Sequence, residues 1–572
     1  MPALLVTATV AGSLTGTATA QQPFPSAETL GISEEQRQNI TSQLEQLQQQ
    51  VVELKKQDGD LRLVADVEVY AKAAEWILRH NEFFRENYAA QTLKALETGL
   101  ERAKQLAAGE SPWTSTTGTV IRGYYSDVDG SVQPYALTVP EGVESRSAKR
   151  WPLHVNLHGR GSTLNEVSFI ARNDARPLPE GQDWVQLDVF GRTNNAYRWA
   201  GETDVFEAIR DVNRTVRIDS RRIVLRGFSM GGAGAWHLGL HHPSKWCSVG
   251  PGAGFVDFYK YQKQEEQLPE YQHQALHIYD AVDYVLNAAN VPVCTYGGEN
   301  DAQLVASTSM VESAEKLGVD IKLLIGPGVG HKFHPDSFKE FMAFHREKME
   351  DGRPPYPGSG NLRFVTWTLK YNRCDWLRVE EMLEMYKPAI VQSAMDRNGT
   401  LKIRTQNVAV LHIARDVADL VEIDGKLMKL RTAADGLLPG VYFELGKDEW
   451  YTMDYDSSRI FPDNLDLRKR NDLQGPIDDA FMQPFVCVKG TGTPWSEKHQ
   501  QWADWTLARF DREFDKWMRG RILTVNDTDL TDEQIADRNL ILFGDPGSNA
   551  VLKKIVDQLP VEWTKDGYVV QG

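Results

Sequence analysis

Cysteine is scarce in this chain of 572 residues, which has only four. Cys247, Cys294, Cys374 and Cys487 lie far apart in the sequence. This spacing excludes a disulfide-rich scaffold and offers no Cys-x-x-Cys pair for a metal or redox site. Cys247 and Cys294 fall in apolar stretches, so we expect them to be small buried core residues.

Positive charge is also in deficit, and the formal net charge is −16. This balance argues against a nucleic acid or an anionic membrane surface as partner. No run beyond the N-terminus approaches the ~18 apolar residues of a membrane span. The length indicates three or four domains, and nothing in the sequence indicates an oligomeric state.

The N-terminal residues 1–20 are apolar and small, and they end in Ala18-Thr19-Ala20. This pattern is typical of a secretory signal peptide cleaved after Ala20, although no Lys or Arg precedes the apolar stretch. We expect a secreted or periplasmic protein. A truncated start or a disordered tail are the alternatives.

Hydrophobic periodicity divides the rest of the chain. Residues 27–112 show apolar positions three and four apart, which predicts packed helices. Residues 113–350 alternate strands with helices, which predicts an α/β domain with a doubly wound parallel sheet. A Pro- and Gly-rich linker at 351–361 precedes a small β-rich domain at 362–438 and a mixed α/β domain at 439–572.

The strand Ile223–Leu225 leads into Gly227-Phe228-Ser229-Met230-Gly231, and a helix-like run of small residues follows. This is the layout of a nucleophile elbow, in which a tight strand-to-helix turn raises a serine above the sheet. The glycines suit a turn that has no room for a Cβ. We predict that Ser229 is a nucleophile.

A serine nucleophile needs a general base that a third group orients, and in this architecture the chain order is Ser, acid, His. Asp301 and His331 follow two successive predicted strands, so both lie where functional sites gather in open α/β sheets. Glu299 is the alternative orienting carboxylate. His331 and His334 lack a third ligand for zinc, so no metal is expected.

The oxyanion of an acyl-transfer reaction needs two N–H donors. Met230, directly after the nucleophile, is one candidate. The second is expected in the loop His158-Gly159-Arg160-Gly161, which follows an early strand; we favour the N–H of Arg160, with Gly159 as the alternative. The glycine loop Gly544–Asn549 fits no phosphate-binding motif, and no cofactor is predicted.

Residues 191–204 follow another sheet strand and are candidates to line the substrate pocket. Tyr197 and Trp199 are predicted to stack on a sugar or phenolic ring, and Arg192 or Arg198 to meet a carboxylate. The alternative is that Asp204 and Glu207 pair with these arginines and order the loop.

Together these motifs, which cover about a third of the chain, resemble the α/β-hydrolase superfamily. The similarity is to its prolyl-oligopeptidase-like branch, which includes secreted feruloyl and acetylxylan esterases. The resemblance implies a serine hydrolase that works through an acyl-enzyme. True prolyl oligopeptidases carry a β-propeller before this domain, whereas here helices and a hairpin precede it, which weakens a peptidase assignment.

Three hypotheses follow from the sequence. The first is a secreted serine esterase acting on small-molecule or polysaccharide esters, of feruloyl or acetyl type. The second is a serine peptidase with the same residues. The third is a carbohydrate- or partner-binding protein whose triad is vestigial.

Overall fold

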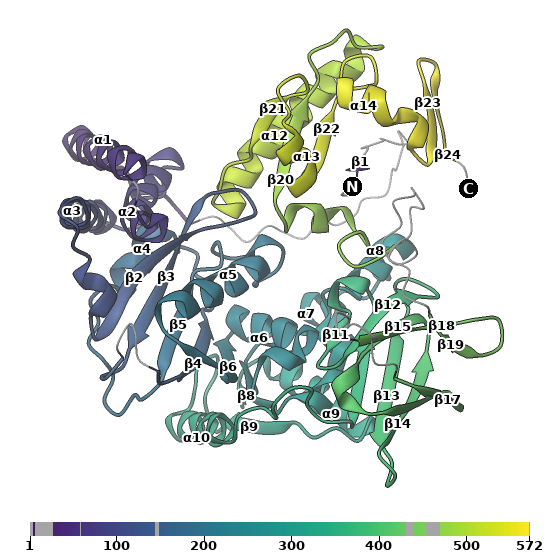
Figure 1. Ribbon diagram of the computed structural model, residues 1–572. Coiled ribbons are helices and arrows are strands. Elements are labelled where there is room, and N and C mark those ends of the chain that lie inside the picture. Colours follow the sequence, from purple (N-terminus) through teal and green to yellow (C-terminus); the bar gives the residue numbers. More distant parts are fainter. Residues whose placement is uncertain are drawn as a thin grey trace.

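The computed structural model describes residues 4–5, 27–57, 59–143, 148–430, 440–453 and 469–570 (Figure 1). The predicted signal segment lies outside these residues, apart from a two-residue strand, β1 (Leu4–Leu5), that pairs in parallel with β22 (Asn539–Phe543). Within the described ranges, no helix has both the length and the apolar character needed to cross a membrane.

The central domain is built on an eight-stranded sheet with the order β2-β3-β5-β4-β6-β7-β8-β9. Only the pairs β2–β3 and β3–β5 are antiparallel, so the predicted, mostly parallel α/β sheet is confirmed. The strands are β2 (Gly118–Tyr125), β3 (Val132–Val139), β4 (Trp151–Leu157), β5 (Val185–Val189), β6 (Ile218–Phe228), β7 (Ser248–Gly252), β8 (Cys294–Gly298) and β9 (Lys322–Gly326).

Helices connect the parallel strands and cover the sheet. For this reason every residue of β7 is buried, and so is every residue of β4 except Asn156. Short helices also fill the connection from β7 to β8. The connecting elements are α4 (Glu166–Asn173), α5 (Ala200–Thr215), α6 (Met230–His241), α7 (Phe258–Gln262), α8 (Glu270–Leu276), η3 (Ala281–Asn290), α9 (Leu304–Lys316) and α10 (Pro335–Asp351).

The order of the strands reverses between β4 and β6. From β4 the chain crosses to β5 on one side, and it then returns to β6 on the other side. The loops that follow β4 and β6 therefore diverge, and the carboxyl ends of two such strands are the place where open α/β sheets have their ligand crevice. The predicted elbow and the predicted oxyanion loop lie at this point.

Three helices precede the sheet: α1 (Glu34–Lys56), α2 (Leu61–Arg79) and α3 (Tyr88–Ala107). Ser33 caps α1 with a capping box, and the stripe from Ile40 to Leu54 is buried as its spacing predicts. Helix α2 packs so closely on β2 that a Cβ at Gly123 would lie 2.4 Å from the carbonyl oxygen of Ala65. The helical region therefore shares its core with the hydrolase sheet.

Two five-stranded sheets form the next domain around a shared apolar core. The second sheet continues through β19 at Thr452, beyond the predicted domain boundary at residue 438, because β18 pairs with β15 and β19 pairs with β18. The strands are β10 (Leu362–Thr366), β11 (Arg373–Cys374), β12 (Leu377–Met382), β13 (Ala389–Met395), β14 (Thr400–Gln406), β15 (Val408–Ala414), β16 (Leu420–Ile423), β17 (Lys426–Lys429), β18 (Gly440–Leu445) and β19 (Trp450–Thr452).

The C-terminal domain is a small parallel sheet, β22-β20-β21, with β1 beside β22. The glycine loop after β22 is closed by its own side chains: Asp545 accepts hydrogen bonds from Gly547 and Ser548, and Asn549 caps the next helix. The elements are β20 (Phe485–Lys489), α12 (Glu497–Met518), β21 (Thr524–Asn526), α13 (Asp532–Asp537), α14 (Ala550–Ile555) and the hairpin β23 (Val561–Thr564) with β24 (Gly567–Val570).

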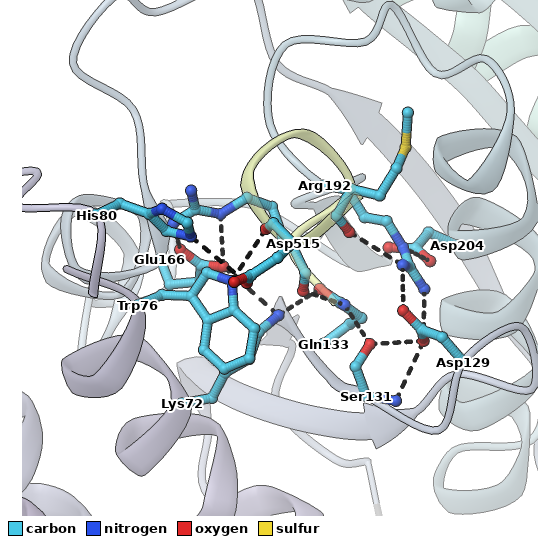
Figure 2. Close-up of polar contacts among 12 residues, drawn as sticks. Lys72, Trp76, His80, Asp129, Ser131, Gln133, Glu166, Arg192, Asp204 and Asp515 are labelled. Atoms are coloured by element: carbon cyan, nitrogen blue, oxygen red, sulfur yellow. Dashed lines mark hydrogen bonds and ion pairs between the residues drawn. The ribbon is translucent and has the colours of Figure 1, made fainter. Parts of the chain in front are cut away.

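Buried charges join the C-terminal domain to the rest of the molecule (Figure 2). Arg519, just after α12, pairs with Glu82 at 2.8 Å and with Glu166 at 2.5 Å, and Lys72 lies 3.5 Å from Glu166. Val128, at the tip of the β2–β3 hairpin, packs into the apolar core of the C-terminal domain. Removing one partner from such a buried charge cluster is strongly destabilising.

Candidate active site

Ser229 lies at the turn between β6 and α6, with backbone angles φ 60° and ψ −122°. A non-glycine residue in this region is strained, as a nucleophile elbow requires. A Cβ on Gly227 would lie 2.2 Å from the carbonyl oxygen of Gly231, and one on Gly231 would lie 2.0 Å from that of Leu157. Only glycine fits at both positions, and the turn presents the Ser229 hydroxyl at the crevice.

A chain of two hydrogen bonds joins three side chains that come from three different strand ends. His331 Nε2 lies 2.8 Å from Ser229 Oγ, and His331 Nδ1 lies 2.8 Å from Asp301 Oδ2. The side chain of Asp301 is only 5% exposed, whereas that of His331 is 42% exposed. An accessible imidazole backed by a buried carboxylate can take the serine proton.

The alternative carboxylate is engaged elsewhere. Glu299 Oε2 accepts a hydrogen bond of 2.7 Å from the backbone N–H of Gly328, so it ties two loops together. Asp301, in contrast, also accepts from the N–H of Gln303 through its other oxygen, which fixes the orientation of the carboxylate. Across the described residues, no three His, Cys, Asp or Glu side chains are grouped so that they could hold a metal ion.

The predicted oxyanion donors lie on both sides of Ser229. Met230 is the first residue of α6, so its N–H has no carbonyl to bind within the helix. Gly159 lies directly against the nucleophile, since a Cβ there would be 3.3 Å from the Cβ of Ser229. Arg160 is the next residue of the same loop.

The prediction that Arg192 meets a substrate carboxylate is wrong. Its side chain is completely buried and pairs with Asp129 at 2.8 Å and with Asp204 at 2.9 Å (Figure 2). It also donates to the carbonyl oxygen of Met518 in the C-terminal domain. The structure therefore agrees with the alternative for Arg192, in which this arginine pairs with Asp204 and orders the loop.

The predicted stacking of Tyr197 on a substrate is wrong as well. Tyr197 is fully buried, and its hydroxyl accepts a hydrogen bond of 2.6 Å from the N–H of His158. Trp199 is half-buried, donates through Nε1 to Asp478 at 3.1 Å and packs against Tyr279. Both rings therefore have structural contacts within the protein, and the indole N–H of Trp199 is bound to Asp478.

Arg198 differs from its neighbours in this segment. It donates one hydrogen bond, of 3.1 Å, to the carbonyl oxygen of Tyr279, and its guanidinium lies over the rings of Phe255 and Tyr279. Burial lowers its pKa, and the charge of the Asp280 carboxylate opposes that shift. Phe255 follows Gly254, where a Cβ would lie 2.6 Å from the N–H nitrogen of Ala233 in the elbow helix. Arg198 is therefore a half-buried cation that lies over two aromatic rings.

Two contacts at the site were not predicted from the sequence. The Phe228 ring lies 4.9 Å from that of His331 and 5.0 Å from that of Phe333, so it supports the imidazole from below the elbow. Asn194 forms hydrogen bonds with Gly161 at the end of the oxyanion loop. Two successive asparagines indicate a turn, but they do not reveal which loop the amide contacts.

Comparison with known proteins gives a family match for part of the chain. Residues 193–351 match the model of the prolyl oligopeptidase family. No curated protein matches the chain.

Solved structures that are similar include a ferulic acid esterase, with 18% identity over 41% of this chain and 100% of that one and a TM-score of 0.32. An S-formylglutathione hydrolase from Staphylococcus aureus has 15% identity over 41% and 99%, with a TM-score of 0.30. A putative dipeptidyl aminopeptidase IV from Bacteroides ovatus has 17% identity over 42% and 37%, with a TM-score of 0.31. Scores this low do not inform on activity.

The matched residues include the elbow, the loop with Asp301 and the loop with His331. The order of the sheet and the reversal between β4 and β6 are those of an α/β hydrolase. The central domain thus has the α/β-hydrolase fold, and it resembles the prolyl oligopeptidase family of serine hydrolases.

Proposed function

We propose that this protein is a serine esterase that cleaves feruloyl or acetyl esters of the plant-polysaccharide type through an acyl-enzyme. The observation that carries the proposal is the continuous hydrogen-bonded chain from Asp301 through His331 to Ser229. Ser229 attacks the ester carbonyl while His331 takes its proton, and Asp301 stabilises the imidazolium that forms. The N–H groups of Met230 and Arg160 bind the oxyanion. His331 then returns the proton to the leaving alcohol, and water hydrolyses the acyl-enzyme.

The elements that precede the central domain favour an ester over a peptide as the substrate. Three packed helices and a hairpin occupy the described residues from 27 to 139. A propeller that would restrict entry to short peptides is absent from that range. A half-buried cation, Arg198, also lies beside the aromatic ring of Phe255, and such a pair suits a substrate with an acidic or phenolic group.

A serine peptidase is the second candidate, and the match of residues 193–351 to the prolyl oligopeptidase family favours it. It would use the same three side chains, with an amine as leaving group. We also propose export of the protein, because Ala18-Thr19-Ala20 has the form of a cleavage site. N-terminal sequencing of the mature protein tests this, and a first residue of Gln21 would support export.

One substrate panel separates these candidates. It contains p-nitrophenyl acetate, methyl ferulate, acetylated xylan and a proline-amide peptide, each assayed with the wild type and with Ser229→Ala. Ester turnover that the substitution abolishes supports the proposal, whereas faster amide turnover favours the peptidase. If Ser229 does not react with a fluorophosphonate probe, the esterase and the peptidase assignments are both wrong. That result would favour the hypothesis of a binding protein with a vestigial triad.

A further inference from the structure

The segment from Phe190 to Trp199 has an unusual backbone. Five of its non-glycine residues have positive φ, between 53° and 75°. Such conformations persist only where the surrounding structure fixes them, and they gather at functional sites. The five are Arg192, Thr193, Ala196, Tyr197 and Trp199.

This segment holds both ends of the loop His158–Gly161. At the far end, Asn194 Oδ1 accepts a hydrogen bond of 3.0 Å from the N–H of Gly161, and Asn194 Nδ2 donates one of 2.9 Å to its carbonyl oxygen. At the near end, the Tyr197 hydroxyl accepts from the N–H of His158 at 2.6 Å and donates to its carbonyl oxygen at 3.3 Å. Two pairs of hydrogen bonds therefore clamp the loop.

The ring of His158 adds a third connection. Its Nε2 lies 2.9 Å from the carbonyl oxygen of Phe190, and its Nδ1 lies 2.9 Å from that of Gly159. Burial lowers the pKa of this histidine, so the ring is neutral near pH 7 and donates one hydrogen bond. Gly159 itself lies against Ser229.

The segment is anchored in turn by distant parts of the chain. Arg192 binds Asp129 of the β2–β3 hairpin (Figure 2). It also donates to Ser126 of the same hairpin and to the carbonyl oxygen of Met518 in the C-terminal domain. Trp199 binds Asp478, just before β20. The anchors come from parts of the chain before and after the segment, so distant residues help to fix its strained form.

We propose that residues 190–199 form a bracket that sets the position of the oxyanion loop, with Asn194 and Tyr197 as its positioning residues. This inference rests on the proposed function, since it assigns the loop His158–Gly161 to the oxyanion site. The bracket touches no reacting atom. It acts by keeping the N–H of Arg160 at the place where the oxyanion forms, and small displacements of such a donor are costly to turnover.

The test uses Asn194→Ala and Tyr197→Phe in the full chain. Asn194 is exposed, so its removal leaves the core intact, and phenylalanine keeps the buried ring of Tyr197. We expect kcat for p-nitrophenyl acetate to fall about 10–100-fold in each variant, below the 10²–10³ for loss of a donor itself. KM should stay within about 3-fold, because the ground state gains little from the oxyanion donors. The affinity for a phenylboronic acid, which mimics the tetrahedral oxyanion, should fall in parallel with kcat.

Matched controls are available for both changes. Asn398→Ala alters an exposed asparagine in the β-rich domain, and Tyr284→Phe removes a buried hydroxyl that has no hydrogen-bond partner within the described ranges. Both should leave kcat unchanged. A kcat within about 3-fold of wild type in Asn194→Ala and in Tyr197→Phe, or a loss confined to KM, would overturn the proposal. Esterase activity that survives Ser229→Ala would instead overturn the proposed function.

Discussion

Replacing Asp301 by asparagine isolates what the buried carboxylate does for His331. The 2.8 Å contact places a negative charge beside a ring that becomes positive when it takes the serine proton. With charge centres about 4 Å apart and an effective dielectric constant of about 20, the attraction is about 4 kcal/mol, or about 10³ in rate. Water at the half-exposed imidazole screens part of it, whereas the asparagine N–H group, which favours the wrong tautomer, adds to the loss.

We therefore expect kcat/KM for p-nitrophenyl acetate to fall about 10³–10⁴-fold in Asp301→Asn. The assay is a series of initial rates from about pH 5 to pH 9, with thermal unfolding recorded for each variant to show that the fold is retained. The matched control is Glu299→Gln, which keeps an oxygen acceptor for the N–H of Gly328. A loss of less than about tenfold in Asp301→Asn, or a larger loss in Glu299→Gln, would refute the assignment of the orienting carboxylate.

Three further predictions concern the turn, the buried acids and the pocket. Gly231→Ala should prevent folding or cost more than about 4 kcal/mol, because the new Cβ would meet the carbonyl oxygen of Leu157 at 2.0 Å; soluble expression and thermal melts check this, and a melting temperature near wild type would contradict it. Burial raises the pKa of Glu207 from 4.5 to about 7. Between pH 4.5 and about 7 the folded protein therefore holds a proton that the unfolded chain releases. The free energy of unfolding falls by up to about 3 kcal/mol as the pH rises through this window. Glu207→Gln should remove that slope in urea unfolding measured across the window, and an unchanged slope would mean that the group is ionised in the folded protein. Arg198→Gln should lower kcat/KM about 10–100-fold for the p-nitrophenyl half-ester of succinic acid, but less than about 3-fold for p-nitrophenyl acetate; equal losses would exclude a carboxylate-binding role.

The parts of the fold that the sequence predicts are those that depend on neighbouring residues. The capping boxes at Ser33 and Thr531 fix the starts of α1 and α13, and each involves only residues three apart in the sequence. The glycines around Ser229 are likewise required because a Cβ would clash at the turn, so a few neighbouring residues are enough to predict the elbow. The sheet extends past the predicted boundary at 438 because β18 pairs with β15 and β19 pairs with β18, which no local pattern shows.

The roles of residues 191–199 depended on partners far away in the chain. Arg192, Tyr197 and Trp199 have the composition of a binding pocket, and nothing local distinguishes a cation that meets a substrate from one that meets Asp129 or Met518. Burial decides between the two. A fully buried guanidinium must be paired within the protein, since an unpaired charge in the interior is too costly.

The sequence alone determined the fold class of the central domain and the order in which Ser229, Asp301 and His331 follow their strands, because periodicity, turn sterics and chain order are local or one-dimensional properties. Only the tertiary structure decided that Glu299 faces Gly328 rather than the imidazole, and that the left-handed segment after β5 holds the oxyanion loop. These outcomes depend on distances between loops from different strands. Such distances follow from the packing of the whole chain, including the C-terminal domain that contacts Arg192.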